Sequence, residues 1–214
     1  MTMPAATVAL VVFALVSGAL ATWSQVKDRR RLHLVTKPLT TALIIAVATL
    51  AASPVPAAYK TLVLAGLVFS LLGDVALMYP DKWFTAGLAA FLVAQIFYIL
   101  AFRPRPGHPV SLATVLPYIL YGLLMFFLLA PKLGPMKVPV FVYIAAITTM
   151  AGFAAARYVD MGGTRTLLAF IGGVLFLVSD SVLAYDRFAR KVPGARILVL
   201  GTYFPAQILI ALSI

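Results

Sequence analysis

Eight long apolar stretches, separated by short segments with charged residues, proline and glycine, restrict this chain to membrane folds. The mean hydropathy is +1.05, and 63% of the 214 residues are hydrophobic while 11% are charged. A soluble domain has too little polar surface to cover that many apolar side chains. A membrane-spanning helix takes about 20 residues, so the length suffices for eight spans with short turns. We therefore expect an all-α membrane protein with a single transmembrane domain over residues 1–214.

The limits of the apolar stretches predict where the eight helices lie. The expected spans are Ala5–Trp23, Lys37–Ala52, Thr61–Met78, Phe84–Phe102, Ser111–Ala130, Val138–Ala156, Thr166–Ala184 and Ile197–Ile214. The first span carries its basic residues after its apolar core, which is the reverse of a cleavable signal peptide. We expect it to be retained as a helix.

The basic residues are concentrated in alternate connections. Of the 17 Lys and Arg residues, 12 lie in the first, third, fifth and seventh connections: Lys27, Arg29, Arg30, Arg31, Lys37, Lys82, Lys132, Lys137, Arg187, Arg190, Lys191 and Arg196. The positive-inside rule then predicts that both termini lie outside the cytoplasm. The net charge of +11 is explained by this anchoring, so we do not expect a nucleic-acid partner.

The supply of metal-binding and nucleophilic side chains is small. The chain has no cysteine, and its only histidines are His33 and His108. A zinc hydrolase usually has at least three His, Asp or Cys ligands. We therefore expect neither a metal nor another cofactor, and the sequence excludes cysteine nucleophiles and disulfides.

Two segments of the chain resemble each other around an aspartate. FSLLGDVALMY (69–79) aligns with FLVSDSVLAY (176–185), so that Asp74 matches Asp180 and Tyr79 matches Tyr185. FLVAQIFY (91–98) and TYFPAQILI (202–210) also share an Ala-Gln step. This similarity predicts two four-helix repeats, about 1–104 and 105–214, although chance similarity between apolar helices is the alternative.

Asp74 and Asp180 are the strongest functional signal, because each lies inside a predicted span. An aspartate at the bilayer centre costs about 2.5 to 3.5 kcal/mol on insertion scales, so such side chains usually face the bundle interior. Two neighbouring carboxyls in a poorly hydrated pocket would supply one acid and one base. We predict both residues to be catalytic. The structural alternative is a helix–helix hydrogen bond, or an ion pair with a lysine such as Lys37.

Further polar groups inside the spans are predicted to bind substrate. Lys37 opens the second span at the expected depth of the aspartates, where its ammonium group would hold a phosphate or a carboxylate. The alternative is that its side chain only snorkels to the membrane interface. Ser70 lies one turn before Asp74. The remaining candidates, each of which has an ordinary interhelical hydrogen bond as its alternative, are Gln95, Tyr98, Tyr118, Tyr143, Tyr203 and Gln207, with Tyr121 beside Tyr118. Gly73, Gly172 and Gly173 indicate close helix packing.

Several stretches resemble the YhhN family of bacterial membrane proteins, whose animal members are the TMEM86 lysoplasmalogenases. They are TKPLTT (36–41), LVFSLLGDVALMY (67–79), FLVAQIFY (91–98), VYIAAITTM (142–150), LVSDSVLAY (177–185) and TYFPAQILI (202–210). Gln95 departs from the family pattern, which favours histidine there. The resemblance implies a location in the bacterial inner membrane and hydrolysis of the vinyl ether bond of lysoplasmalogens, which yields a fatty aldehyde and a glycerophospho-alcohol without a known metal.

This implied chemistry matches the pair of aspartates. A vinyl ether is hydrolysed when an acid protonates its outer alkene carbon, and the resulting oxocarbenium ion is stabilised by negative charge, as in glycoside hydrolysis. Asp180 is the favoured acid. The lysophospholipid substrate would lie among membrane lipids. Two alternatives remain at this stage: a proton-coupled or solute transporter that uses the same aspartates, and a lipid-binding or scaffold protein without turnover.

Overall fold

The computed structural model describes residues 4–51, 55–105, 107–108 and 110–214. Its described part contains helices and no strands, and eight helices are long and apolar enough to cross a membrane. They are α1 (Ala5–Val26), α2 (Arg30–Leu50), α3 (Ala57–Leu77), α4 (Pro80–Phe102), α5 (Leu112–Leu129), α6 (Lys137–Met161), α7 (Gly163–Ala184) and α8 (Ala195–Leu212). Short 3-10 turns η1 (Ala130–Lys132) and η2 (Gly134–Met136) precede α6, and a π-helical turn η3 (Tyr185–Ala189) follows α7. The expected all-α membrane fold with eight spans is confirmed.

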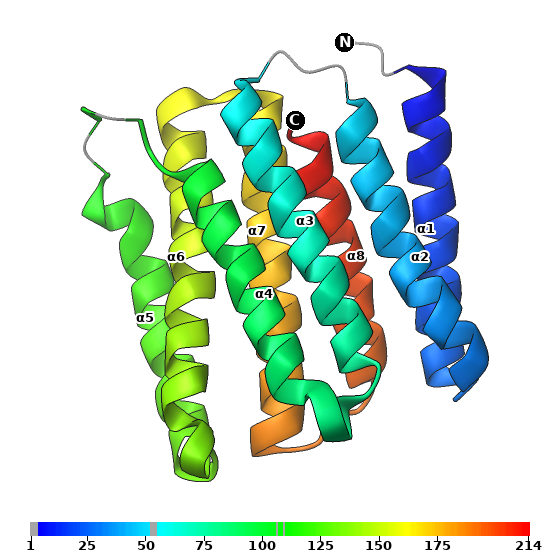
Figure 1. Ribbon diagram of the computed structural model, residues 1–214. Coiled ribbons are helices and arrows are strands. Elements are labelled where there is room, and N and C mark those ends of the chain that lie inside the picture. Colours follow the sequence, from blue (N-terminus) through cyan, green and yellow to red (C-terminus); the bar gives the residue numbers. More distant parts are fainter. Residues whose placement is uncertain (1–3, 52–54, 106, 109) are drawn as a thin grey trace.

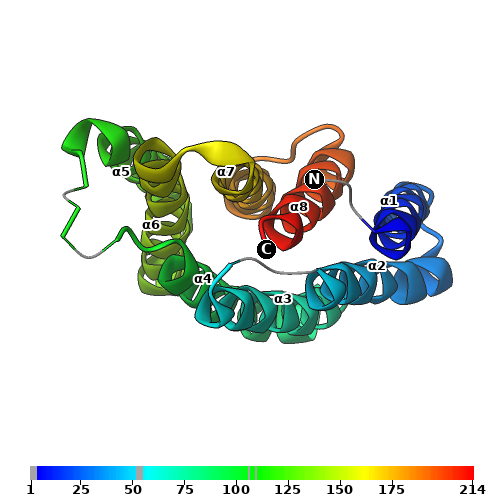
Figure 2. The same ribbon diagram turned by 90° about the horizontal axis from the view of Figure 1, so that it is seen from above.

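The helices form two layers that close around α8 (Figures 1 and 2). Helices α2, α3 and α4 stand in a curved row, and α7, α8 and α1 stand behind them. Helix α6 joins the two layers because it packs against both α4 and α7, whereas α5 lies outside the bundle against α6. Helix α8 contacts α1, α2, α3 and α7. Side chains from α2, α3, α4, α7 and α8 therefore meet inside the bundle.

Two helix ends differ from the predicted limits by more than four residues. Helix α2 begins at Arg30 and not at Lys37, so Lys37 lies two turns inside a helix and not in a connection. The charged residues before Lys37 indicate a connection, but the first turns of a helix tolerate charge at the interface. Pro38 is accommodated inside α2. Helix α6 continues past Ala156 to Met161, where Gly162 takes a left-handed φ of 61° and ends it. The predicted end of the second span, Ala52, lies outside the described residues.

Glycine allows the helices of two pairs to approach closely. A Cβ atom at Gly73 would lie 2.6 Å from the ring of Phe91 on α4, and one at Gly172 would lie 2.8 Å from Ile210 on α8. A Cβ atom at Gly173 would make only an ordinary contact of 3.5 Å with Ala154. The packing role predicted for Gly73 and Gly172 is thus observed. The α3–α4 and α7–α8 pairs are equivalent in the proposed repeat, which itself stays a prediction.

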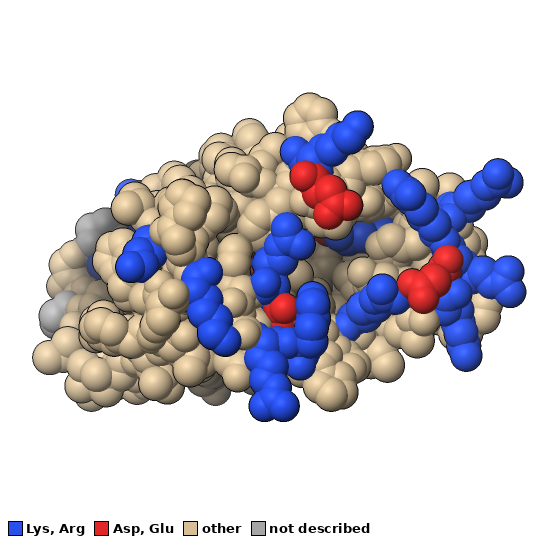
Figure 3. Space-filling view, turned by 90° about the horizontal axis from the view of Figure 1, so that it is seen from below, with Lys and Arg blue, Asp and Glu red and all other residues tan. Residues whose placement is uncertain are grey.

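Basic side chains gather at one end of the bundle. The connections α1–α2, α3–α4, α5–α6 and α7–α8 all lie at the lower end in Figure 1, whereas the C-terminus lies at the opposite end with the start of α1. Seen from below, Lys and Arg side chains surround a hollow near the middle of this face (Figure 3). The alternation of basic and less basic connections therefore corresponds to two ends of the molecule.

Candidate active site

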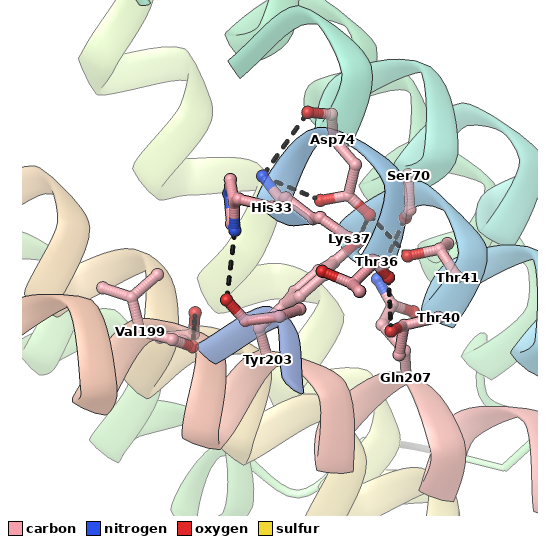
Figure 4. A network of polar contacts seen from close by, with 12 residues as sticks. His33, Thr36, Lys37, Thr40, Thr41, Ser70, Asp74, Val199, Tyr203 and Gln207 are labelled. Atoms are coloured by element: carbon pink, nitrogen blue, oxygen red, sulfur yellow. Dashed lines mark hydrogen bonds and ion pairs between the residues drawn. The ribbon is translucent and has the colours of Figure 1, made fainter. Parts of the chain in front are cut away.

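Asp74 lies near the end of α3 inside a closed group of polar side chains (Figure 4). Lys37 Nζ is 3.2 Å from its Oδ1 atom, and the two side chains are 9% and 1% exposed. The hydroxyls of Thr41 and Tyr203 donate hydrogen bonds to Oδ2 at 2.6 and 2.7 Å. The carboxyl is thus surrounded by a cation and two donors from α2 and α8. This arrangement matches the ion-pair alternative that the sequence left open.

A second set of hydrogen bonds lies next to this group, one turn earlier along α3. Tyr98 donates from its hydroxyl to Gln207 Oε1 at 2.8 Å, and Gln207 Nε2 donates to Ser70 Oγ at 3.0 Å. All three side chains are fully buried. They join α3, α4 and α8 by hydrogen bonds, so each donor and acceptor used here is already satisfied within the protein.

Asp180 lies on α7 and has different partners. Its Oδ2 atom accepts hydrogen bonds from the hydroxyl of Tyr143 on α6 and, at 3.4 Å, from Gln95 Nε2 on α4. Its Oδ1 atom has no hydrogen-bonding partner in the described part of the chain, and no cation forms an ion pair with it there. Without a neighbouring cation, an apolar setting favours the protonated acid over the carboxylate.

An apolar cavity opens beside Asp180 between α4, α5, α6, α7 and η3, and its empty volume, including its mouth, is about 660 Å³. Its apolar lining includes Phe84, Leu88, Phe91, Met125, Leu129, Val140, Ile144, Ile147, Leu177 and Phe188. The polar side chains in its wall are those of Asp180, Tyr143, Tyr121, Ser181 and Thr148. Tyr121 donates to Ser181 Oγ at 2.8 Å. A carboxyl group therefore faces a cavity of hydrocarbon character, and Asp74 is not part of its wall.

The predicted site residues divide between the two carboxyls. Lys37, Ser70, Tyr98, Tyr203 and Gln207 belong to the Asp74 side, and Gln95 and Tyr143 belong to the Asp180 side. The structure brings Tyr118 to neither, because this half-buried ring on α5 packs against α6 beside Gly152.

No hydrogen bond joins the two carboxyls, and they share no hydrogen-bonding partner in the described residues. The Asp74 group and the Asp180 cavity are in contact through two rings. Tyr203, which donates to Asp74, packs against Phe91 of the cavity wall, with centroids 5.8 Å apart. Asp74 and Asp180 therefore lie in different surroundings, and of the two it is Asp180 that lines the apolar cavity.

Some residues of these groups were not predicted from the sequence. Thr41 follows Lys37 by four residues, so the spacing of a helix could have indicated that both face Asp74. Ser181 and Thr148 line the cavity but resemble ordinary helix residues, since each donates back to a carbonyl one turn earlier. In the described part of the chain, no group of three His, Cys, Asp or Glu side chains could hold a metal ion.

Fold and site together define a polytopic α-helical membrane protein in which one carboxyl is closed in an ion pair and another faces an apolar cavity. Residues 32–214 match the YhhN family, and the chain belongs to this family. It is 39% identical over 158 residues to the protein named lysoplasmalogenase TMEM86A of Bos taurus, covering 72% of this chain and 65% of that protein. To lysoplasmalogenase TMEM86B of Mus musculus it is 38% identical over 160 residues, covering 74% of this chain and 66% of that protein.

A bacterial relative matches over more of its own length. The uncharacterized membrane protein YhhN of Escherichia coli O157:H7 is 26% identical over 178 residues, covering 83% of this chain and 85% of that protein. The chain spans about 65% of the length of the TMEM86 relatives named above. No solved structure was found to match it.

Proposed function

We propose that this protein is a membrane-embedded hydrolase that cleaves the vinyl ether bond of lysoplasmalogens to a fatty aldehyde and a glycerophospho-alcohol. The observation that carries the proposal is the carboxyl of Asp180 in the wall of an apolar cavity. Relatives named lysoplasmalogenase, at 38 to 39% identity, support the substrate class. Membership in the YhhN family supports it further.

The cavity suits the hydrocarbon part of a lysoplasmalogen. Its wall is made mostly of Leu, Ile, Val, Met and Phe side chains, and an alkyl chain gains free energy by leaving water for such surroundings. Asp180 lies one turn before the end of α7, at the basic end of the bundle. The vinyl ether lies just below the lipid head group, so it would meet Asp180 while the chain extends along the cavity.

In this proposal Asp180 performs both proton transfers. Protonated Asp180 gives its proton to the outer alkene carbon, and the carbon bound to oxygen becomes part of an oxocarbenium ion. The carboxylate left behind stabilises this cation, and its Oδ2 charge is shared with the donors Tyr143 and Gln95. Water then adds to the cationic carbon and returns a proton to Asp180, and the hemiacetal collapses to aldehyde and alcohol.

Asp74 is proposed to position the site and not to touch substrate. Its charge is balanced by Lys37, so it offers little net negative charge to a distant cation. Its hydrogen bond from Tyr203 fixes a ring that packs on Phe91, and Phe91 lines the cavity. The two-carboxyl mechanism expected from the sequence is thus reduced to one acid and one buried anchor.

The orientation in the membrane is proposed from the distribution of charge. The basic end of the bundle would face the cytoplasm, and both termini would lie on the other side. The bacterial relative supports placement in a bacterial cell membrane. Substrate would then enter from the inner leaflet, because Asp180 lies one turn before the end of α7 that is on the basic side of the bundle.

Aldehyde release from a purified lysoplasmalogen tests the proposal. We expect release by the wild-type protein in detergent micelles and a loss of about 100-fold to 10,000-fold in kcat for Asp180→Asn, which is the usual contribution of a general acid. Asp160→Asn is the matched control, because Asp160 lies at the opposite end of the bundle with Arg105 and His108. A folded wild-type protein that releases no aldehyde, or an active Asp180→Asn variant, would contradict the proposal.

A further inference from the structure

Arg187 lies at the edge of the Asp180 cavity. It belongs to the π-helical turn η3, is exposed, and holds its guanidinium carbon 4.9 Å from the centroid of the Phe84 ring. Phe84 and Phe188 both line the cavity, and their rings contact each other edge to face with centroids 5.8 Å apart. The π-helical turn, a local irregularity often found at functional sites, thus places a cation directly beside the cavity wall.

The charge of Arg187 is available to a ligand. In the part of the chain that the structure describes, no carboxylate forms an ion pair with Arg187, whereas Lys191 pairs with Asp186 at 3.0 Å and Arg196 with Asp28 at 2.6 Å. Lys132 donates to the carbonyl of Ala189. A guanidinium stacked on an aromatic ring keeps the N–H groups of its own plane free for other partners. Arg187 therefore presents unused donors next to Phe84 and Phe188, two residues of the cavity wall.

The spacing between Arg187 and Asp180 fits a single lysophospholipid. The two residues are seven positions apart on a continuous helical segment, which corresponds to about 10 Å along the axis. In a lysoplasmalogen about six bonds separate the vinyl carbon on oxygen from the phosphorus, or about 7 to 8 Å when extended. Helical side chains lean toward the N-terminus of their helix, which brings the guanidinium toward Asp180.

We propose that Arg187 binds the phosphate of the lysolipid while Asp180 acts on its vinyl ether, an inference that rests on the proposed function. Arginine recognises phosphate with two parallel N–H donors and holds its charge at every physiological pH. Lys37, the residue that the sequence favoured for this task, is buried against Asp74. Arg187 is therefore a substrate-binding residue that selects phosphorylated lipids.

The test compares two substrates and two variants. The substrates are a lysoplasmenylethanolamine and the corresponding 1-alkenylglycerol, which has the same vinyl ether and no phosphate. For Arg187→Gln we expect KM to rise about tenfold or more on the phospholipid, because a charge-assisted contact is lost, with kcat nearly unchanged. On the alkenylglycerol we expect no change. Arg190→Gln, which removes an exposed charge from the same connection, should behave as wild type on both substrates.

Three results would overturn the assignment: an unchanged KM for Arg187→Gln, an equal loss on both substrates, or an equal loss in Arg190→Gln. Failure of the proposed function is recognised separately, since the wild-type protein would then release no aldehyde from either substrate. In that case binding of a radiolabelled 1-alkyl lysophospholipid, which has no bond to hydrolyse, still tests Arg187. Weaker binding in Arg187→Gln than in Arg190→Gln supports the phosphate contact, and equal binding refutes it.

Discussion

Replacing Asp74 with Asn tests whether this carboxyl is an anchor or a second catalytic group. The change leaves an amide that can still accept from Thr41 and Tyr203, but it removes the charge that balances Lys37. At the 3.2 Å separation, Coulomb's law with an effective dielectric constant of about 20 gives an attraction of about 5 kcal/mol. Breaking a buried pair on one side usually destabilises by about 3 to 5 kcal/mol, because a charge remains buried without compensation. We expect Asp74→Asn to lose this much stability.

The double variant Lys37→Met/Asp74→Asn separates stability from catalysis. Two uncharged side chains of similar size should restore most of the lost stability, since neither leaves a charge without a partner. Thermal unfolding in detergent measures the change in stability. At about 2 to 4 °C per kcal/mol for a chain of this size, the single variant should melt about 6 to 20 °C lower than wild type.

Aldehyde release by the same variants measures the change in catalysis. If Asp74 is an anchor, the double variant should regain turnover to within about tenfold of wild type. Asp180→Asn should stay inactive although folded. A double variant that is as stable as wild type but has no activity would refute the anchor and restore the two-carboxyl mechanism. An Asp74→Asn protein that is as stable as wild type would refute the energetic argument.

Three further changes follow from the geometry of the site and the packing. Tyr143→Phe removes a donor to the acid carboxyl and should lower kcat about tenfold with little change in KM, measured by aldehyde release; an unchanged kcat would contradict this. Met125→Trp fills part of the cavity, so the preferred chain length, measured by competition between substrates, should become shorter; an unchanged preference would place the chain elsewhere. Gly66→Ala forces a Cβ into the ring of Tyr98 and should destabilise by about 1 to 3 kcal/mol, whereas Gly201→Ala, which meets nothing within 4 Å, should not.

Hydropathy was sufficient to predict the fold class, because a membrane helix must be apolar over a fixed length regardless of its neighbours. The eight spans were predicted in this way. The close packing at Gly73 was predicted from the small residue itself. The start of α2 was not predicted, because the basic residues before Lys37 have the local pattern of a connection between spans. In the structure the helix continues through them, and α2 packs against α1, α3 and α8.

The sequence predicted most of the residues near the two carboxyls, but not which carboxyl each residue contacts. Asp74 and Asp180 could be found because an ionisable group inside a span requires a polar environment. Which partners each carboxyl has depends on contacts between helices that are distant in sequence, such as Tyr203 with Asp74 and Tyr143 with Asp180. No local pattern encodes these pairings. For the same reason, the sequence did not reveal that a single carboxyl borders the cavity.

A structure with a bound 1-alkyl lysophospholipid, which resembles the substrate but lacks the reactive double bond, tests the central claim most directly. We predict that the ether oxygen and first chain carbon lie in contact with the carboxyl of Asp180, with the chain inside the cavity lined by Phe91 and Leu129. An analogue whose ether lies beside Asp74, or whose chain lies outside the bundle away from Asp180, would contradict the account.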